Sequence, residues 1–261
     1  MTTTYPFEAE ASGDDLTTVG RPATRIDGLE KISGAAQFVD DIDFGPGLLY
    51  AAIVESPHAY ARIISIDTSE AEAADGVVRV ATGTDFPYKF GMYMEDRYIM
   101  AQDYVLFVGE QVAGVIAWSH RAAVRASKLI KVEYEVLQPL LDPKSAVVDG
   151  ADLIHPDLAD YTHVPWFFPE ADTNIAHWRK IRKGDTEKAF AEADFVLEDT
   201  YQVPRYAHCA IEPHVTVSRL DQAGRLTVWT ASQSQHTQRH LFAEALAPLG
   251  FTHKDVRVIT P

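Results

Sequence analysis

The sequence predicts an α+β or mixed α/β protein organised in two domains. Short runs that alternate apolar and polar residues are typical of half-buried strands. Segments with helical spacing of apolar residues lie between several of these runs. The chain has 261 residues, more than a typical single domain, and its 46% apolar content is ordinary for a globular protein.

The first third of the chain predicts an N-terminal arm followed by short elements. Residues 1–18 are polar and acidic without periodicity, so we expect a mobile arm. Turn-forming residues then separate several short apolar runs. These predict strands at 36–39, 48–54 (buried), 61–67 and 77–82, and a short helix at 69–74 that Ser69 caps.

The next segment combines an aromatic loop, an interrupted strand and a helix. Residues 84–103 predict a loop-rich excursion. The apolar stretch 105–118 is split by Gly-Glu-Gln, which predicts two strands or one bulged strand. Alanine and leucine recur at helical spacing in 119–129, with Ser119 as the N-cap, and a strand at 130–135 follows.

Residues 144–180 are rich in Asp, His and Pro and are expected to form a linker between the domains. They include His155, His163 and His177, which are candidate metal ligands by residue type. Their spacing matches neither a helical nor a tight-turn ligand pair, so we expect no metal site there.

The last part of the chain predicts a helix, a hairpin and a strand–helix–strand unit. The helix at 185–193 is expected to turn Ala189 and Phe190 inward. The hairpin is expected to turn at Gly224, which supplies the positive φ angle. The remaining elements are strands at 194–198, 200–203, 215–219, 226–230 and 256–259 and a helix at 237–246.

Ser232, Gln233 and Ser234 lie at the predicted strand-to-helix turn. Two interpretations remain open on the residues alone. A serine at this position is a common N-cap that accepts a bond from a free backbone N–H group. Alternatively, the backbone N–H groups and the positive end of the helix dipole point at an anionic or oxo-bearing cofactor.

Charge and composition exclude several classes of function. The formal net charge of −15 argues against a nucleic-acid surface and against binding to anionic lipid. No apolar run approaches the roughly 18 residues that span a bilayer, and the N-terminus lacks the pattern of a signal peptide. Cys209 is the only cysteine, which excludes an internal disulfide, so we expect a reducing, cytoplasmic location.

A series of short runs follows one order along almost the whole chain. They are Asp-Gly-Leu-Glu-Lys-Ile-Ser-Gly-Ala-Ala at 27–36, Ser-Pro-His-Ala-Tyr-Ala-Arg-Ile at 56–63, Val-Gly-Glu-Gln-Val-Ala at 108–113, Lys-Val-Glu-Tyr-Glu at 131–135, Glu-Pro-His at 212–214 and Ser-Gln at 232–233. In this order and spacing they resemble the molybdenum-binding large subunit of the xanthine dehydrogenase and aldehyde oxidase family.

The resemblance implies an α/β hammerhead domain at 19–143 and the incomplete beginning of a mixed α/β molybdopterin-binding domain at 181–261. It also places Gln233 where the family has a glutamine whose amide hydrogen-bonds the apical oxygen of the molybdenum centre. A neutral amide N–H group can do this without taking a ligand position. The resemblance therefore favours cofactor binding by Gln233, with Ser232 and Ser234 beside it.

The resemblance also bears on the segment before the hairpin, which carries Cys209, Glu212 and His214, with His208 beside the cysteine. By residue type, Glu212 with His214 could form an acid–base pair and Cys209 could be a soft metal ligand. In the family a pterin dithiolene holds the metal, so we expect no protein metal ligand and a packed Cys209. Glu212-Pro213-His214 is then a structural run that leads into the hairpin.

The family's glycine-rich loop and its general-base glutamate come after the position of Pro261, so we expect no catalytic residue within 1–261. Glu55 also departs from the family, where many relatives carry arginine. The implied function is part of the molybdenum-cofactor subunit of a hydroxylase that oxidises an aldehyde or N-heteroaromatic substrate with oxygen from water. The implied partners are the rest of the molybdopterin-binding part, an iron–sulfur subunit and an FAD subunit. The alternative is a non-catalytic interaction or assembly module.

Overall fold

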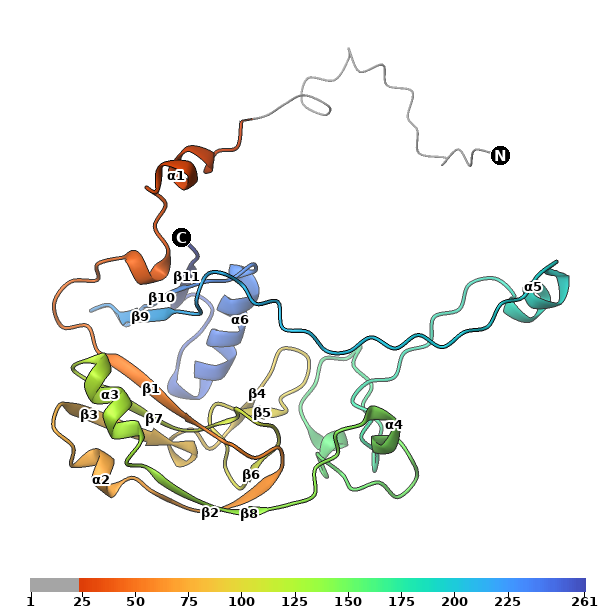
Figure 1. Ribbon diagram of the computed structural model, residues 1–261, viewed down its shortest axis with the longest axis horizontal. Helices are drawn as coiled ribbons and strands as arrows, with labels where there is room; N and C mark the ends of the chain where they lie inside the picture. Colours follow the sequence, from red (N-terminus) through yellow and green to blue (C-terminus); the bar gives the residue numbers. More distant parts are fainter. Residues whose placement is uncertain (1–23) are drawn as a thin grey trace.

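The computed structural model describes residues 24–261 (Figure 1). The arm expected at 1–18 lies outside these residues. The first described elements are the helix α1 (Gly28–Ser33) and a 3-10 turn, η1 (Val39–Asp41), where a strand was expected. That prediction was wrong because the Asp41 carboxylate accepts a hydrogen bond from Phe38 N at 3.0 Å, which closes the chain into a turn.

One three-stranded antiparallel sheet forms the upper layer of the first part of the molecule. Its central strand is β7 (Gln111–Ala117), paired with β1 (Tyr50–Glu55) and β3 (Val77–Thr82). The helix α3 (His120–Ser127) packs on β1 and β7, and α2 (Ser69–Glu72) lies against β3. The expected N-cap of α3 is confirmed, since Ser119 Oγ accepts from Ala122 N at 3.2 Å.

A second three-stranded sheet lies beneath the first (Figure 1). It has β2 (Ala61–Asp67) between β6 (Tyr104–Val105) and β8 (Lys131–Val136). Thus the interrupted stretch 105–118 forms two strands, β6 and β7, which belong to different sheets.

Two buried clusters make up the core of this first part. One contains Val115 and Ile130 and the other contains Val105 and Val112. Val54 packs against both clusters, and so does Val132 of β8, so the two sheets share one interior.

Two details of this part correct the sequence prediction. The strand near 48–54 was expected to be buried, but β1 is an edge strand and Ile53 is 43% exposed. Ser69 was expected to cap α2, but the N-cap residue is Thr68. Ser69 instead donates through both N and Oγ to Asp67 Oδ1, at 3.0 and 2.6 Å.

The loop-rich excursion contains the small hairpin β4 (Lys89–Phe90) and β5 (Arg97–Tyr98). The following segment contains α4 (Pro143–Ala146) and a 3-10 turn at Leu158–Asp160. Asn174 holds this segment together: its Oδ1 accepts from Ile154 N at 2.8 Å, and its Nδ2 donates to two backbone carbonyls at 2.9 Å. The boundaries 19–143, 144–180 and 181–261 remain predictions.

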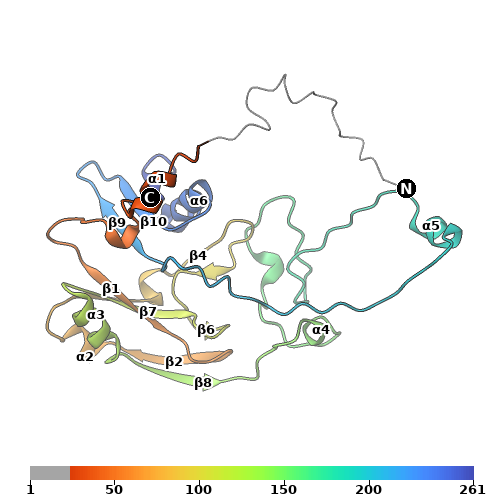
Figure 2. The same cartoon turned by 45° about the horizontal axis from the view of Figure 1, so that its top comes forward.

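The helix α5 (Thr186–Glu192) stands away from the other described helices and strands in both views (Figures 1 and 2). Phe190 was expected to face inward, but it is 65% exposed. Residues 194–203 were expected to form two strands, but they pair with no other strand among the described residues. An apolar run becomes a strand only where another strand offers its backbone groups.

The C-terminal part forms a second small unit. The expected hairpin of β9 (Thr216–Leu220) and β10 (Leu226–Thr230) is confirmed, and Gly224 has φ +77°. The helix α6 (Gln235–Leu246) then crosses to β11 (Val256–Ile259), which pairs with β10 in parallel. α6 also contacts β4, which joins this unit to the first part of the molecule. None of the helices within 24–261 is long and apolar enough to cross a membrane.

Candidate cofactor-binding site

The turn at 231–234 connects the carboxyl end of β10 to the amino end of α6. Because β10 and β11 are parallel, this turn lies at the carboxyl edge of a strand–helix–strand unit. Ligands of open α/β sheets bind outside the carboxyl ends of the strands, where helix N-termini point their free N–H groups. The fold therefore positions the turn for binding.

The strand that leads into the turn is firmly held. Val228 is buried, and Thr230 Oγ1 shares a hydrogen bond of 2.9 Å with Thr216 Oγ1 of the neighbouring strand. Trp229 packs edge-on against Phe44, with ring centroids 5.1 Å apart, and the guanidinium of Arg219 lies over its ring. Fixed neighbours on both faces of β10 limit how far the turn can move.

The two serines of the turn bond locally. Ser232 Oγ accepts from Ser234 N at 3.0 Å, and Ser234 Oγ shares a hydrogen bond of 2.6 Å with Thr237 Oγ1. Ser234 is the N-cap residue of α6, but its side chain makes no capping bond to the helix backbone. Its hydroxyl therefore stabilises the turn through Thr237 rather than through the helix N–H groups.

Gln233 lies between the serines with its side chain exposed. Within residues 24–261, no hydrogen bond occupies its amide, so the N–H group can donate to a bound molecule. An exposed amide donor on a fixed turn suits a second-sphere contact with an oxygen-bearing group. The residues present thus fit the molybdopterin-type cofactor that the sequence predicts, and the assignment of Gln233, Ser232 and Ser234 to it remains a prediction.

The three linker histidines are not brought together. His155 Nδ1 lies 3.3 Å from the Tyr161 hydroxyl, and His163 Nδ1 lies 3.0 Å from the carbonyl oxygen of Val164. His177 Nδ1 accepts from Phe168 N at 3.0 Å. Burial lowers the pKa of His155 below its ordinary value, with Lys89 adding to the effect and Asp96 opposing it. Each ring therefore serves the local structure of its own loop.

The segment before the hairpin differs from the prediction at its cysteine. Cys209 was expected to be packed, but it is exposed and has φ +50°. Its segment forms no strand and is exposed, so Cys209 is not part of a packed core. Glu212 is half-buried and His214 is exposed in the irregular stretch before β9.

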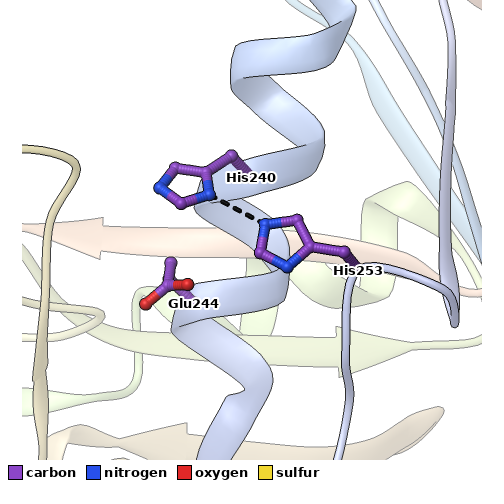
Figure 3. Close-up of side chains that lie close together, drawn as sticks. All are labelled: His240, Glu244 and His253. Atoms are coloured by element: carbon purple, nitrogen blue, oxygen red, sulfur yellow. Dashed lines mark hydrogen bonds between the residues drawn. The ribbon is translucent and has the colours of Figure 1, made fainter.

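Two features of the structure were not predicted from the sequence. One is a cavity of about 690 Å³ beside the first part of the molecule. Its walls include Tyr60, Arg97, Phe107, Leu140, Ile154 and Arg205. They come from separate segments, so no local motif could have indicated it. The other is the group of His240, Glu244 and His253 (Figure 3), for which the i, i+4 spacing of the first two was the available signal.

Comparison with known proteins identifies both parts of the chain. Residues 33–138 match the family model "Aldehyde oxidase and xanthine dehydrogenase, a/b hammerhead domain", and residues 167–261 match "Molybdopterin cofactor-binding domain". The chain belongs to the xanthine dehydrogenase and aldehyde oxidase family. The resemblance seen in the sequence and the α+β fold class are thereby confirmed.

Two curated relatives show how much of the family's chain is present. A "Nicotinate dehydrogenase large molybdopterin subunit" from Eubacterium barkeri is 33% identical over 95% of this chain and 54% of its own length. A "Carbon monoxide dehydrogenase large chain" from Afipia carboxidovorans is 32% identical over 92% of this chain and 30% of its own. The chain thus spans about half or less of these relatives.

Solved structures of the family share the fold. A "Reconstituted CO dehydrogenase from Oligotropha carboxidovorans" is 30% identical, with a TM-score of 0.76 over 93% of this chain and 30% of its own. The quinoline 2-oxidoreductase from Pseudomonas putida 86 is 26% identical, with a TM-score of 0.75 over 92% of this chain and 30% of its own.

Proposed function

We propose that this chain forms part of the molybdenum-cofactor subunit of a hydroxylase or dehydrogenase that oxidises an aldehyde or N-heteroaromatic substrate. The observation that carries the proposal is the amide of Gln233 on the β10–α6 turn, which makes no hydrogen bond within residues 24–261 and lies inside the part that matches the cofactor-binding domain model. Relatives named for nicotinate, quinoline, xanthine and aldehydes support the substrate class.

When bound, a molybdopterin-type cofactor supplies two-electron oxidation of a substrate carbon with oxygen from water. The role we assign to this chain is to bind and orient it. Gln233 donates its amide N–H to an oxygen of the cofactor without ligating the metal. Ser232 and Ser234 lie beside that contact and hold the turn in shape through their local hydrogen bonds.

The partners we propose are the remaining part of the molybdopterin-binding domain, an iron–sulfur subunit and an FAD subunit, in a cytoplasmic hetero-oligomer. The exposed apolar side chains of residues 195–206 support the first of these partners. Phe195 is 83% exposed, Leu197 86% and Tyr201 86%. Several large apolar side chains exposed within one short segment are typical of a surface that another segment covers.

Substitution of Gln233 in the assembled enzyme tests the proposal. We expect Gln233→Ala to lower turnover about 10-fold or more, the usual range for removing a group that orients a metal centre. Gln235→Ala, an exposed glutamine two residues further along the chain, is the matched control and should leave turnover unchanged. Molybdenum content and the unfolding midpoint should be the same in all three proteins. Equal turnover in the two variants would contradict the role of Gln233.

A non-catalytic assembly module is the second candidate, and the exposed apolar segment at 195–206 favours it as well. Purification from the native source under mild conditions distinguishes the two. Stoichiometric molybdenum with flavin and iron–sulfur proteins supports the enzyme, whereas a metal-free protein supports the module.

A further inference from the structure

We propose that His240, Glu244 and His253 form a binding site for a divalent transition metal, with Zn²⁺ as the representative ion. One ligand atom from each residue can be chosen so that all three lie within 4.8 Å of one another. Within 24–261 this is the one group of three or more such side chains that meets this distance. The site lies away from the cofactor turn, since His240 and Glu244 are more than one helical turn beyond the start of α6.

Two of the ligands come from one face of α6. His240 and Glu244 are four residues apart, so their side chains project from the same side of the helix (Figure 3). Both are half-buried. This i, i+4 arrangement places an imidazole and a carboxylate close enough to share one ion without a change in the backbone.

The chain after α6 brings the third ligand back to the helix. A 3-10 turn (Ala247–Leu249) ends at Gly250, whose φ of +89° lets the chain reverse, and Gly250 N donates to Ala247 O at 2.9 Å. The reversal leads to His253, which is exposed and lies beside His240 (Figure 3).

The backbone at His253 is held in place. Arg239 Nε donates to the carbonyl oxygen of His253 at 2.9 Å, so the helix itself positions the loop. On the other side, Thr252 donates to the Asp255 carboxylate through N at 2.9 Å and Oγ1 at 2.6 Å. These bonds fix the backbone of the loop on both sides of His253. The loop thus presents its imidazole in a defined position, as a metal site requires.

The contact between the two imidazoles shows where an ion would enter. His240 Nδ1 lies 2.8 Å from His253 Nε2, and the ring centroids are 5.0 Å apart with 25° between the ring planes, so the two rings meet edge to edge. Two ring nitrogens this close need one proton between them, because two lone pairs would repel. A metal ion takes the place of that proton, which moves to the other ring nitrogen of the same imidazole, so both rings stay neutral. Bonds of about 2.05 Å in tetrahedral geometry set the nitrogens about 3.3 Å apart, so the rings separate by roughly half an ångström.

The ligand types select the ion. Two neutral imidazoles and one carboxylate suit Zn²⁺ and its transition-metal neighbours, whereas Mg²⁺ and Ca²⁺ prefer oxygen ligands only. Three protein ligands leave one position of a tetrahedron for water. The bound ion would join α6 to the loop that leads into β11 and so stabilise the parallel strand–helix–strand unit.

Calorimetric titration of the tag-free, chelator-treated 261-residue chain with Zn²⁺ tests the site. We expect one Zn²⁺ per chain and no binding of Mg²⁺. Each of His240→Gln and His253→Gln should weaken Zn²⁺ binding at least about tenfold, because each removes one of three ligands. Glu244→Gln should weaken it less. Co²⁺ should give the intense visible absorption of a four-coordinate site in the unmodified chain.

His236→Gln is the matched control, since His236 is exposed in the first turn of the same helix and outside the group. It should bind Zn²⁺ as the unmodified chain does. Circular dichroism and unfolding midpoints in the absence of metal verify that each variant is folded. Absence of Zn²⁺ binding, or equal affinity in the His253→Gln and His236→Gln chains, would overturn the proposal.

Discussion

The central strand of the first sheet and the segment that follows α5 have similar apolar sequences but different structures. Residues 111–117 and residues 194–203 are both rich in β-branched and aromatic or apolar side chains. The first run forms β7, paired on both sides and covered by α3. The second pairs with no strand of the described chain, and its side chains are exposed.

The difference shows that a segment with high β propensity forms a strand only where a neighbouring strand pairs with its backbone. Each residue of a strand carries one N–H and one C=O group that need partners. β7 finds them in β1 and β3 and buries Val115 completely. Residues 194–203 have no such neighbours within 24–261, so propensity alone leaves them irregular.

The prediction with the largest expected effect compares the same substitution, Val→Ala, at a buried and at an exposed position. Val115→Ala removes two methyl groups from a fully buried site, so we expect a loss of about 2–3 kcal/mol in the free energy of unfolding. Val203→Ala, at a side chain that is 71% exposed, should change it by less than about 0.5 kcal/mol. Denaturant unfolding followed by circular dichroism measures both. A loss at Val203 equal to that at Val115 would mean that the extended segment packs in solution.

A smaller effect compares the helix caps of the two parts. Ser119 accepts a hydrogen bond from Ala122 N at the start of α3, whereas Ser234 makes no capping bond to α6. Ser119→Ala should therefore cost about 1 kcal/mol of unfolding free energy. Ser234→Ala should cost less, because it loses only the contact with Thr237. Denaturant unfolding measures the loss in both variants. A larger loss for Ser234→Ala than for Ser119→Ala would contradict the assignment of the caps.

The smallest effect concerns Glu110, beside the start of β7. Burial raises its pKa above the ordinary value, although the N–H of Leu106 donates to its carboxylate. The folded state therefore holds this proton more tightly than the unfolded state does. The contribution of Glu110 to stability is fully present below its ordinary pKa and declines as pH rises through the raised pKa.

Glu110→Gln removes that decline, so its stability relative to the unmodified chain should increase from pH 4 to pH 7. Unfolding curves at the two pH values measure it. A constant difference between the two proteins would show that Glu110 does not titrate as its burial implies.

The candidate cofactor site could be predicted from the sequence because it is local. Ser232, Gln233 and Ser234 are adjacent, and the strand before them and the helix after them follow from periodicity. The group of His240, Glu244 and His253 could not be predicted in full. His253 reaches His240 only because α6 ends in a 3-10 turn and Gly250 reverses the chain.

By itself the sequence determined most elements of the first part, the β9–β10 hairpin with its turn at Gly224 and the cap at Ser119, because these depend on short-range patterns. It also determined the family, because the motifs follow one another in the family's order. Tertiary structure alone decided that 105–118 divides between two sheets, that 194–203 stays irregular and exposed, and that two distant histidines meet beside Glu244. The physical reason is the same in each case. Backbone pairing and side-chain contacts between distant segments depend on where the whole chain places them, and no local pattern records that placement.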